Sequence, residues 1–194
     1  MKGFIGIDEV GRGPLAGPVT VCAFYLDKKH SIYAMFPKGL KDSKKLNKEK
    51  REEIFKQVKK EKMIFIVSSR SAEHIDKHGI VSSINACINS CIVGLEKKGI
   101  DTYKTPIKLD GGLKLPKEFK KQSTHIKGDE NFPEIALASI CAKVTRDRYM
   151  CNLAKKFPKY FWYENVGYGT KKHREAIKKH KPTKFHRKSF LKNI

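Results

Sequence analysis

The chain has 194 residues, of which 39% are hydrophobic and 32% charged, and it carries 42 Lys and Arg against 20 Asp and Glu. This length fits one domain with a buried core, and the apolar and aromatic content excludes a disordered basic tail. The apolar runs are far too short to span a membrane and the N-terminus has no signal-peptide pattern, so no membrane partner is expected.

The formal net charge of +22 indicates a polyanionic partner, for which nucleic acid is the best candidate. Charge alone would also fit a basic but solvated surface. Its distribution favours nucleic acid, because residues 155–194 hold thirteen Lys and Arg, only two acids and eight aromatic residues. Aromatic faces stack on bases and sugars while cations neutralise phosphates. The five cysteines are odd in number and form no Cys-x-x-Cys pair, which predicts core thiols and a cytoplasmic protein.

Hydrophobic patterning predicts an α/β fold. Residues 4–7 are a short apolar strand that ends at Asp8, and residues 19–26 are its hairpin partner after a turn rich in Gly and Pro. A charged, exposed helix follows over residues 47–60 with Asn47 as its N-cap, and residues 63–69 form a third strand.

The second half of the chain alternates predicted strands and helices. Its predicted elements are a helix over 80–98 that Gly99 ends, short strands over 106–110 and 123–127, a helix from Pro133 to about 157, an aromatic-rich loop over 157–170, a basic helix over 171–180 and an extended tail. Three strands in meander order, then strands alternating with helices, predict a mixed central sheet flanked by helices.

Four carboxylates stand out because they end apolar segments of a basic chain: Asp8, Glu9, Asp110 in Leu-Asp-Gly-Gly, and Asp129 in Lys-Gly-Asp. Asp8 and Glu9 would repel each other without a cation, and strand alternation separates them unless they sit at the very end of the strand. Hard divalent ions such as Mg²⁺ take one or two carboxylates each, so four acids could hold two ions around one phosphate. The alternative is a set of ordinary turn acids.

Residues 11–18, here called the glycine–arginine turn, superficially match the dinucleotide-binding fingerprint. That fingerprint must open a helix, whereas Pro14 and Pro18 flank this turn and a strand follows. Two interpretations stay open. Gly11 and Gly13 let a nucleotide approach the backbone while Arg12 reaches a phosphate, or the segment is a plain tight turn.

The order of these motifs closely resembles that of the type 2 ribonucleases H, the ribonuclease HII family. Residues 6–19, Gly-Ile-Asp-Glu-Val-Gly-Arg-Gly-Pro-Leu-Ala-Gly-Pro-Val, carry the likeness most clearly. It continues through residues 40–46, 109–111, 127–129, 140–147, 167–171 and 186–190. The resemblance therefore spans nearly the whole chain in collinear order.

The resemblance implies a ribonuclease H-like catalytic core over residues 1–156. A basic, aromatic-rich C-terminal segment over residues 157–194 would complete the substrate groove. The resemblance also places the catalytic metal site, with two Mg²⁺ or Mn²⁺ ions, on Asp8, Glu9, Asp110 and Asp129.

The resemblance further implies how substrate is read. Backbone groups of Gly11, Arg12 and Gly13 would contact the 2′-hydroxyl, which separates RNA from DNA at one position, with Arg12 near the phosphate. Tyr168 would stack on the sugar at the RNA–DNA junction, and Lys44 would line the groove. Loop packing for Tyr168 and a solvated loop lysine for Lys44 are the alternatives.

Asp147 competes with Asp129 as the fourth metal ligand. In a helix starting near Pro133, Asp147 lies about 21 Å along the axis at 1.5 Å per residue. Asp129 lies just before that helix and cannot easily share a site with it. We therefore predict Asp129 as the ligand and expect Asp147 to pair with Arg146 or Arg148.

The sister type 3 enzymes usually carry Lys at the position of Arg12 and an extra N-terminal domain, whereas this chain starts almost at the catalytic strand, so type 2 is expected. The implied activity is endonucleolytic hydrolysis of the RNA strand of RNA–DNA hybrids. It includes nicking on the 5′ side of single ribonucleotides in duplex DNA, by a monomer. The alternatives are a non-catalytic RNA-binding protein of ribosomal type and another nuclease of the same superfold, such as a resolvase.

Overall fold

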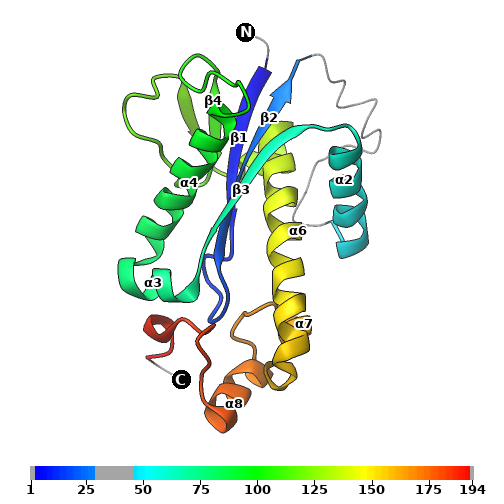
Figure 1. The fold of residues 1–194 in the computed structure, drawn as a ribbon, viewed down its shortest axis with the longest axis vertical. Coiled ribbons are helices and arrows are strands. Elements are labelled where there is room, and N and C mark those ends of the chain that lie inside the picture. Colours follow the sequence, from blue (N-terminus) through cyan, green and yellow to red (C-terminus); the bar gives the residue numbers. More distant parts are fainter. Residues whose placement is uncertain (1–2, 29–45, 193–194) are drawn as a thin grey trace.

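A computed structural model describes residues 3–28 and 46–192 of the chain. Its centre is a five-stranded sheet in the order β3-β2-β1-β4-β5 (Figure 1). The strands are β1 (Gly3–Val10), β2 (Val19–Asp27), β3 (Ile64–Arg70), β4 (Ile107–Asp110) and β5 (Gln122–His125). β1, β2 and β3 pair antiparallel, whereas β4 lies parallel to β1 and β5 parallel to β4. The predicted mixed sheet is confirmed.

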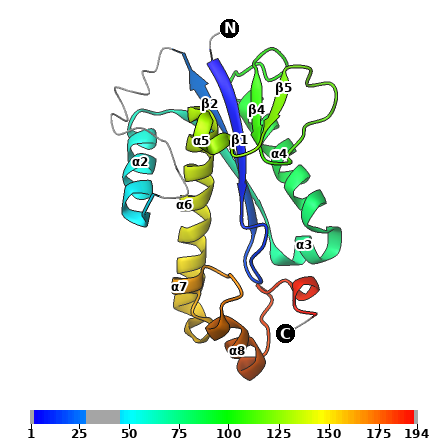
Figure 2. The ribbon, with the colours of Figure 1, turned by 180° about the vertical axis from the view of Figure 1, so that it is seen from behind.

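Helices cover both faces of this sheet (Figures 1 and 2). α3 (Ala72–His78) and α4 (Ile80–Glu96) lie on one side, and α2 (Lys48–Lys60) and α6 (Pro133–Lys156) on the other. Each side has its own apolar cluster, because alternate strand residues point to opposite faces. Cys87 and Cys91 fill the α4 side, in agreement with the prediction of core thiols, and all five thiols are free.

The remaining elements are short and lie mostly in the C-terminal segment: α5 (Gly128–Asn131), η1 (Pro158–Tyr160), α7 (Trp162–Asn165), α8 (Lys171–His180) and η2 (Lys188–Phe190). Figure 1 shows this segment below the end of α6 and the β1–β2 turn. A third apolar cluster joins it to them, with Leu15, Met150 and Trp162 among its members. The segment therefore packs directly against the glycine–arginine turn.

The structure departs from the predicted elements in a few places. β1 runs on to Val10, so Asp8 and Glu9 lie within the strand rather than at its end. The predicted loop over 157–170 contains η1 and α7, because Tyr160 and Trp162 stack on each other and are buried. The short helices α3 and α5 have too few turns to show a helical period in the sequence.

In the part of the chain that the structure describes, no single helix has the length and apolarity to cross a membrane. Only α3 and α4 taken together reach that length, and they are bent by 117° where they meet.

Candidate active site

Asp8 and Asp110 stand side by side on neighbouring strands. β1 and β4 pair in parallel with Ile7 opposite Leu109, so the two acids that follow are level and point to the same face of the sheet. Asp8 is 3% exposed and Asp110 8%. The proximity of these two buried carboxylates thus follows directly from the strand register.

Helix α6 covers the face on which these acids lie. Gly6 precedes Asp8 by two residues, and a Cβ placed on it would lie only 2.2 Å from the main-chain carbonyl of Glu134. Gly6 therefore permits α6 to approach the strand, and the Ser139 side chain reaches the Asp8 carboxylate with a hydrogen bond. Helix α6 therefore shields the site from solvent on this side.

Burial and mutual repulsion shape the charge of this pair. Burial first, and then the neighbouring Asp110 carboxylate, raise the pKa of Asp8 to about 8. Burial also raises the pKa of Glu9, and the Arg12 guanidinium, 3.5 Å from Glu9 Oε1, opposes that rise. Carboxylates whose ionised forms are disfavoured in this way gain from a bound cation, because its charge offsets both repulsion and desolvation.

Asp129 is connected to Asp110 through the preceding residue, Gly128. The Gly128 N–H donates to Asp110 Oδ1 at 2.7 Å, and Gly128 begins α5. Asp129 is the next residue and is 1% exposed. The backbone that carries Asp129 therefore starts next to the end of β4, and the role of Asp129 as a metal ligand stays a prediction.

The four acids do not converge on one point. Within residues 3–28 and 46–192, no three His, Cys, Asp or Glu side chains are grouped so that they could hold one ion. Asp8 Oδ1 instead accepts from the Glu9 N–H at 2.7 Å, and Asp110 accepts from Gly128. Mg²⁺ usually takes only one or two carboxylates and completes its shell with water and phosphate. The buried, mutually repelling acids are therefore suited to ions that each bind one or two carboxylates.

A pocket of about 340 Å³ follows the end of β1 into the glycine–arginine turn. Its walls bring together residues from four parts of the chain: Asp8, Glu9, Val10, Gly11, Arg12 and Gly13, then Arg51 of α2, Ser139, Ile140 and Lys143 of α6, and Tyr168. Two of the predicted acids, the three turn residues and Tyr168 thus share one cavity. Lys44 lies outside the described residues.

The two glycines of the turn differ in what they do. Gly11 has φ +86°, and a Cβ on it would lie 2.2 Å from Arg146 Nε, so packing and backbone conformation both require glycine. Nothing lies within 4 Å of a Cβ placed on Gly13. The fold does not need glycine there, and the space beside it opens on the pocket that Gly13 lines. A close approach of substrate to the backbone would explain Gly13.

A chain of buried rings fixes the loop that carries Tyr168. His173 Nδ1 lies 2.8 Å from the Tyr168 carbonyl, and its Nε2 lies 3.0 Å from Trp162 Nε1 and 3.2 Å from His186 Nε2. His186 Nδ1 accepts from the Thr183 N–H at 2.9 Å. His186 must therefore donate from Nε2 to His173. His173 accepts at Nε2 and donates from Nδ1 to the Tyr168 carbonyl, so each ring carries one proton and is neutral. Burial accordingly lowers both pKa values, that of His186 to about 4.

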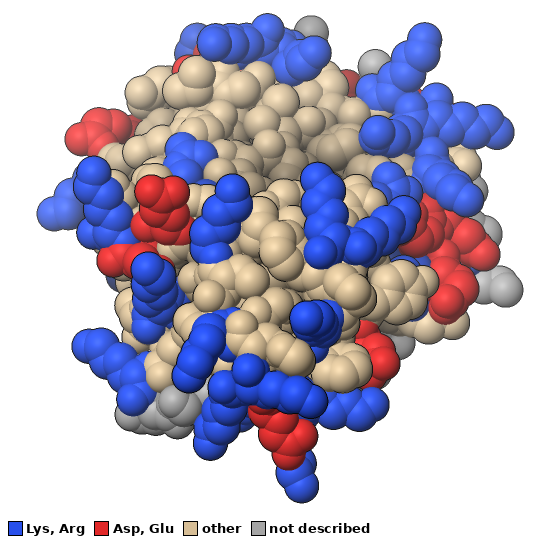
Figure 3. Space-filling view, turned by 60° about the horizontal axis from the view of Figure 1, so that its bottom comes forward, with Lys and Arg blue, Asp and Glu red and all other residues tan. Residues whose placement is uncertain are grey.

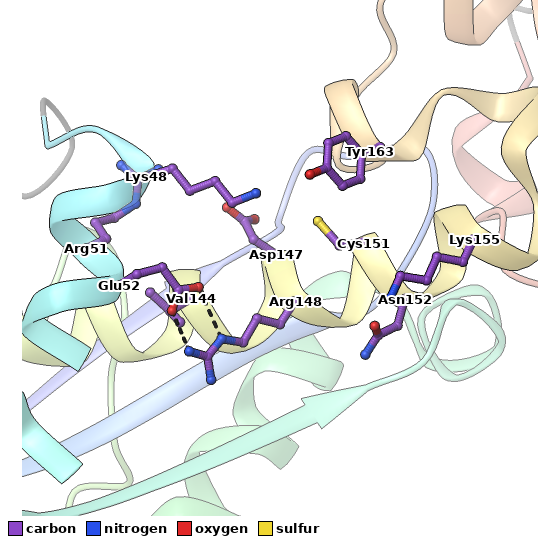
Figure 4. Close-up of a pocket in the computed structure, with 10 residues that line it drawn as sticks. All are labelled: Lys48, Arg51, Glu52, Val144, Asp147, Arg148, Cys151, Asn152, Lys155 and Tyr163. Carbon is purple, nitrogen blue, oxygen red and sulfur yellow. Dashed lines mark hydrogen bonds and ion pairs between the residues drawn. The ribbon is translucent and has the colours of Figure 1, made fainter. Parts of the chain in front are cut away.

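The expected pairing of Asp147 is wrong. Asp147 Oδ1 lies 3.0 Å from Lys143 Nζ, one helical turn away, because neighbours at i and i+4 share a face and adjacent residues do not. Arg148 pairs with Glu52 of α2 instead (Figure 4), and Arg146 donates to main-chain carbonyls.

A second pocket, of about 400 Å³, lies between α2, α6 and α7 (Figure 4). It shares Arg51 with the first pocket. Lys48 of α2 and Tyr163 of α7 face each other across it, with Lys48 Nζ 5.2 Å from the Tyr163 ring centroid. Cations and an exposed aromatic ring thus continue beyond the site, which suits a nucleic-acid strand.

Sequence reasoning missed Ser139, Lys143 and Arg51 as residues of the site. A signal was present for the first two, since Ser139, Lys143 and Asp147 are polar at helical i, i+4, i+8 spacing and therefore lie on one face of α6. Arg51 gave no such signal, because α2 is charged over most of its surface.

Solved structures with this fold are ribonucleases H. The ribonuclease H2 from Pyrococcus horikoshii is 25% identical with a TM-score of 0.71, over 98% of this chain and 100% of that one. A chain of the PCNA–RNase HII complex from Archaeoglobus fulgidus is 25% identical with a TM-score of 0.76, over 96% and 94%. The Bst-RNase HIII complex with Mn²⁺ has a TM-score of 0.78 over 97% of this chain and 67% of that one, but at 21% identity it shows the fold alone. The fold is thus ribonuclease H-like.

Sequence relatives narrow this class to one family. The family model of ribonuclease HII matches residues 5–193. Ribonuclease HII of Caldicellulosiruptor bescii is 40% identical, over 97% of this chain and 86% of its own, and that of Pelagibacter ubique is 42% identical, over 98% and 96%. The chain belongs to the ribonuclease HII family and is a hydrolase of the ribonuclease H type. This membership supports endoribonuclease activity on RNA–DNA hybrids and sets aside the ribosomal and resolvase alternatives.

Proposed function

We propose that this protein cuts the RNA strand of RNA–DNA hybrids and also nicks duplex DNA on the 5′ side of single embedded ribonucleotides, using two Mg²⁺ or Mn²⁺ ions. One observation carries the proposal. Two of the four acids, Asp8 and Glu9, line the same pocket as Tyr168 and the turn that exposes its backbone. A site that must cut beside a single ribose needs both parts within one nucleotide of each other.

Each residue then has a distinct task. Asp8, Glu9, Asp110 and Asp129 would hold the ions, which supply an activated water and stabilise the leaving oxygen. Arg12, whose side chain is 54% exposed, would turn from Glu9 to the phosphate. The backbone beside Gly13 would meet the 2′-hydroxyl, and Tyr168, 43% exposed, would stack on the neighbouring sugar.

The C-terminal segment would complete the substrate groove beside this pocket. Its apolar cluster includes Leu15 and Ala16 of the glycine–arginine turn, so the segment and the turn pack directly against each other. Figure 3 shows that Lys and Arg outnumber acids on this end of the molecule. Such a surface attracts phosphates on either side of the cut. We expect the protein to act as a monomer in the cytoplasm, where its five free thiols stay reduced.

The test uses a DNA duplex that contains one ribonucleotide, with an all-DNA duplex as the blank. The wild type should nick only the first and only with Mg²⁺ or Mn²⁺. Asp8→Asn should slow nicking by at least about 1,000-fold, because removing a metal ligand forfeits several kcal/mol of charge stabilisation. The amide oxygen can still accept from the Glu9 N–H, so the variant should fold and bind duplex.

The matched control is Asp101→Asn, which removes an exposed carboxylate that pairs with Lys104. It should nick at the wild-type rate. If Asp8→Asn also cuts normally, the metal site is wrongly assigned. If the wild type cuts without a divalent ion, the mechanism is wrong.

A further inference from the structure

Two arginines are completely buried behind the glycine–arginine turn. Arg187 is 0% exposed and Arg146 1%. Arg187 donates three hydrogen bonds to carbonyls of the turn: Nε to Gly17 at 3.0 Å, Nη1 to Arg12 at 2.9 Å and Nη2 to Gly11 at 2.6 Å. A charged donor this well placed is among the strongest hydrogen-bonding groups in proteins. The carbonyls at Gly11 and Arg12 are therefore fixed from behind.

Arg146 secures the other end of the turn and links it to the Tyr168 loop. It donates to the carbonyls of Pro18 at 2.9 Å, Ala16 at 3.2 Å and Val166 at 2.9 Å. Val166 stands two residues before Tyr168. The two walls of the pocket that would read substrate are thus joined through one guanidinium.

Arg187 comes from the distant tail of the chain, which is itself tied down. Its N–H donates to the Leu15 carbonyl at 2.8 Å, and the next two residues anchor the tail to α3. There the Asp76 carboxylate accepts from the N–H groups of Lys188 at 2.8 Å and Ser189 at 2.9 Å. A continuous set of contacts therefore runs from the surface of α3 through Arg187 to the turn.

We propose that Arg187 is a positioning residue that aims the N–H groups of Arg12 and Gly13 into the pocket. The peptide unit is planar and trans, so a C=O and the N–H that follows it point in opposite directions. Fixing the carbonyls of Gly11 and Arg12 toward the buried guanidinium turns the N–H groups of the next residues the other way. The cation also polarises these peptides and strengthens their N–H groups as donors.

This assignment rests on the proposed function, because it supplies the donors that would meet the ribose. It also explains why arginine stands at this position. Only a planar fork reaches three separate carbonyls at once, whereas the single ammonium of lysine cannot span Gly11, Arg12 and Gly17. Arg187→Lys therefore keeps a nitrogen donor but removes the planar fork that fixes the three carbonyls.

The experiment compares wild type and Arg187→Lys on two duplexes that differ by one 2′-hydroxyl. Affinity is measured in metal-free buffer and nicking in Mg²⁺. We expect unchanged affinity for all-DNA duplex, loss of the preference for the ribonucleotide duplex, and nicking slower by roughly 10- to 100-fold, as a misplacement of about 1 Å produces. Lys98→Met removes an exposed charge outside the C-terminal segment and should leave both the preference and the nicking rate intact.

The outcomes separate this inference from the function beneath it. A wild type that neither prefers nor cuts the ribonucleotide duplex overturns both. A wild type that does so, with an Arg187→Lys variant that keeps the full preference, overturns only the role of Arg187.

Should Arg187→Lys fail to fold, Asp76→Ala decides the question from the surface of α3. It releases the tail anchor without touching the core, and we expect a partial loss of preference with unchanged affinity for all-DNA duplex. Full preference and a wild-type nicking rate in Asp76→Ala would then overturn the inference.

Discussion

The two halves of the pocket are built in different ways. Asp8 and Asp110 stand on paired strands, and their relative position follows from the β1–β4 register. The glycine–arginine turn and Tyr168 lie on irregular backbone that is held by Arg187 and Arg146 from remote parts of the chain and by the nearby His173. The relative position of these two acids thus follows from regular structure, whereas the half of the pocket that would read the ribose depends mainly on long-range contacts.

Gly13→Ala would sharpen this comparison most. A Cβ on Gly13 meets nothing within 4 Å, so the thermal stability should be unchanged. The new methyl group would occupy the space where the ribose approaches, and we expect nicking to fall on the order of 100-fold, as for a misplacement of about 1 Å. Nicking rate and thermal unfolding are measured on the same preparation.

Gly11→Ala is the matched contrast. There the left-handed backbone costs about 1–2 kcal/mol and Arg146 blocks the Cβ, so stability should drop as well. If Gly13→Ala cuts like wild type, the segment is only a tight turn.

Tyr168→Ala has the next largest expected effect. Loss of the stacking surface, worth about 1–3 kcal/mol per base in comparable sites, should slow nicking at a single ribonucleotide roughly tenfold. General duplex binding should weaken less, because the exposed lysines that would contact phosphate remain. Tyr168→Phe keeps the ring and should stay near wild type. Equal losses in cutting and binding would show that Tyr168 merely packs in its loop.

The smallest expected effect is a pH dependence of stability that comes from the His173–His186 pair. It concerns only the half of the pocket that would read the ribose. In the unfolded chain His186 has a pKa near 6.5, and burial lowers it to about 4 in the fold, so the native state binds fewer protons between these values. The contribution of His186 to the free energy of unfolding is therefore fully present above pH 6.5. It is lost as the pH falls toward 4, by on the order of 2 kcal/mol.

The measurement is urea unfolding of wild type and His186→Gln across this pH range. The variant should be less stable at pH 7 but lose less stability on acidification. Parallel pH curves would mean that the His173–His186 contact does not govern the acid sensitivity of the C-terminal segment.

The first strand and the N-cap of α2 could be predicted because their signals are local, whereas the four acids were assigned through the family resemblance and their role as metal ligands stays a prediction. The apolar run before Asp8, and Asn47, whose side chain accepts from the Lys50 N–H at 2.8 Å, each depend on near neighbours. The role of Arg187 could not be found in this way. Most arginines in so basic a chain face solvent, and only the folded chain brings this one behind residues that precede it by more than 160 positions.

The most direct test of the metal-dependent site is a crystal structure of the protein soaked with Mn²⁺, with the ions located by anomalous scattering. Ions should bind at the ends of β1 and β4 at roughly 2.0–2.2 Å from carboxylate oxygens, with Asp8 and Asp110 sharing one and Asp129 within reach of an ion. A soaked crystal with no ion at these acids, or with Asp129 contacting none, would contradict the site proposed here.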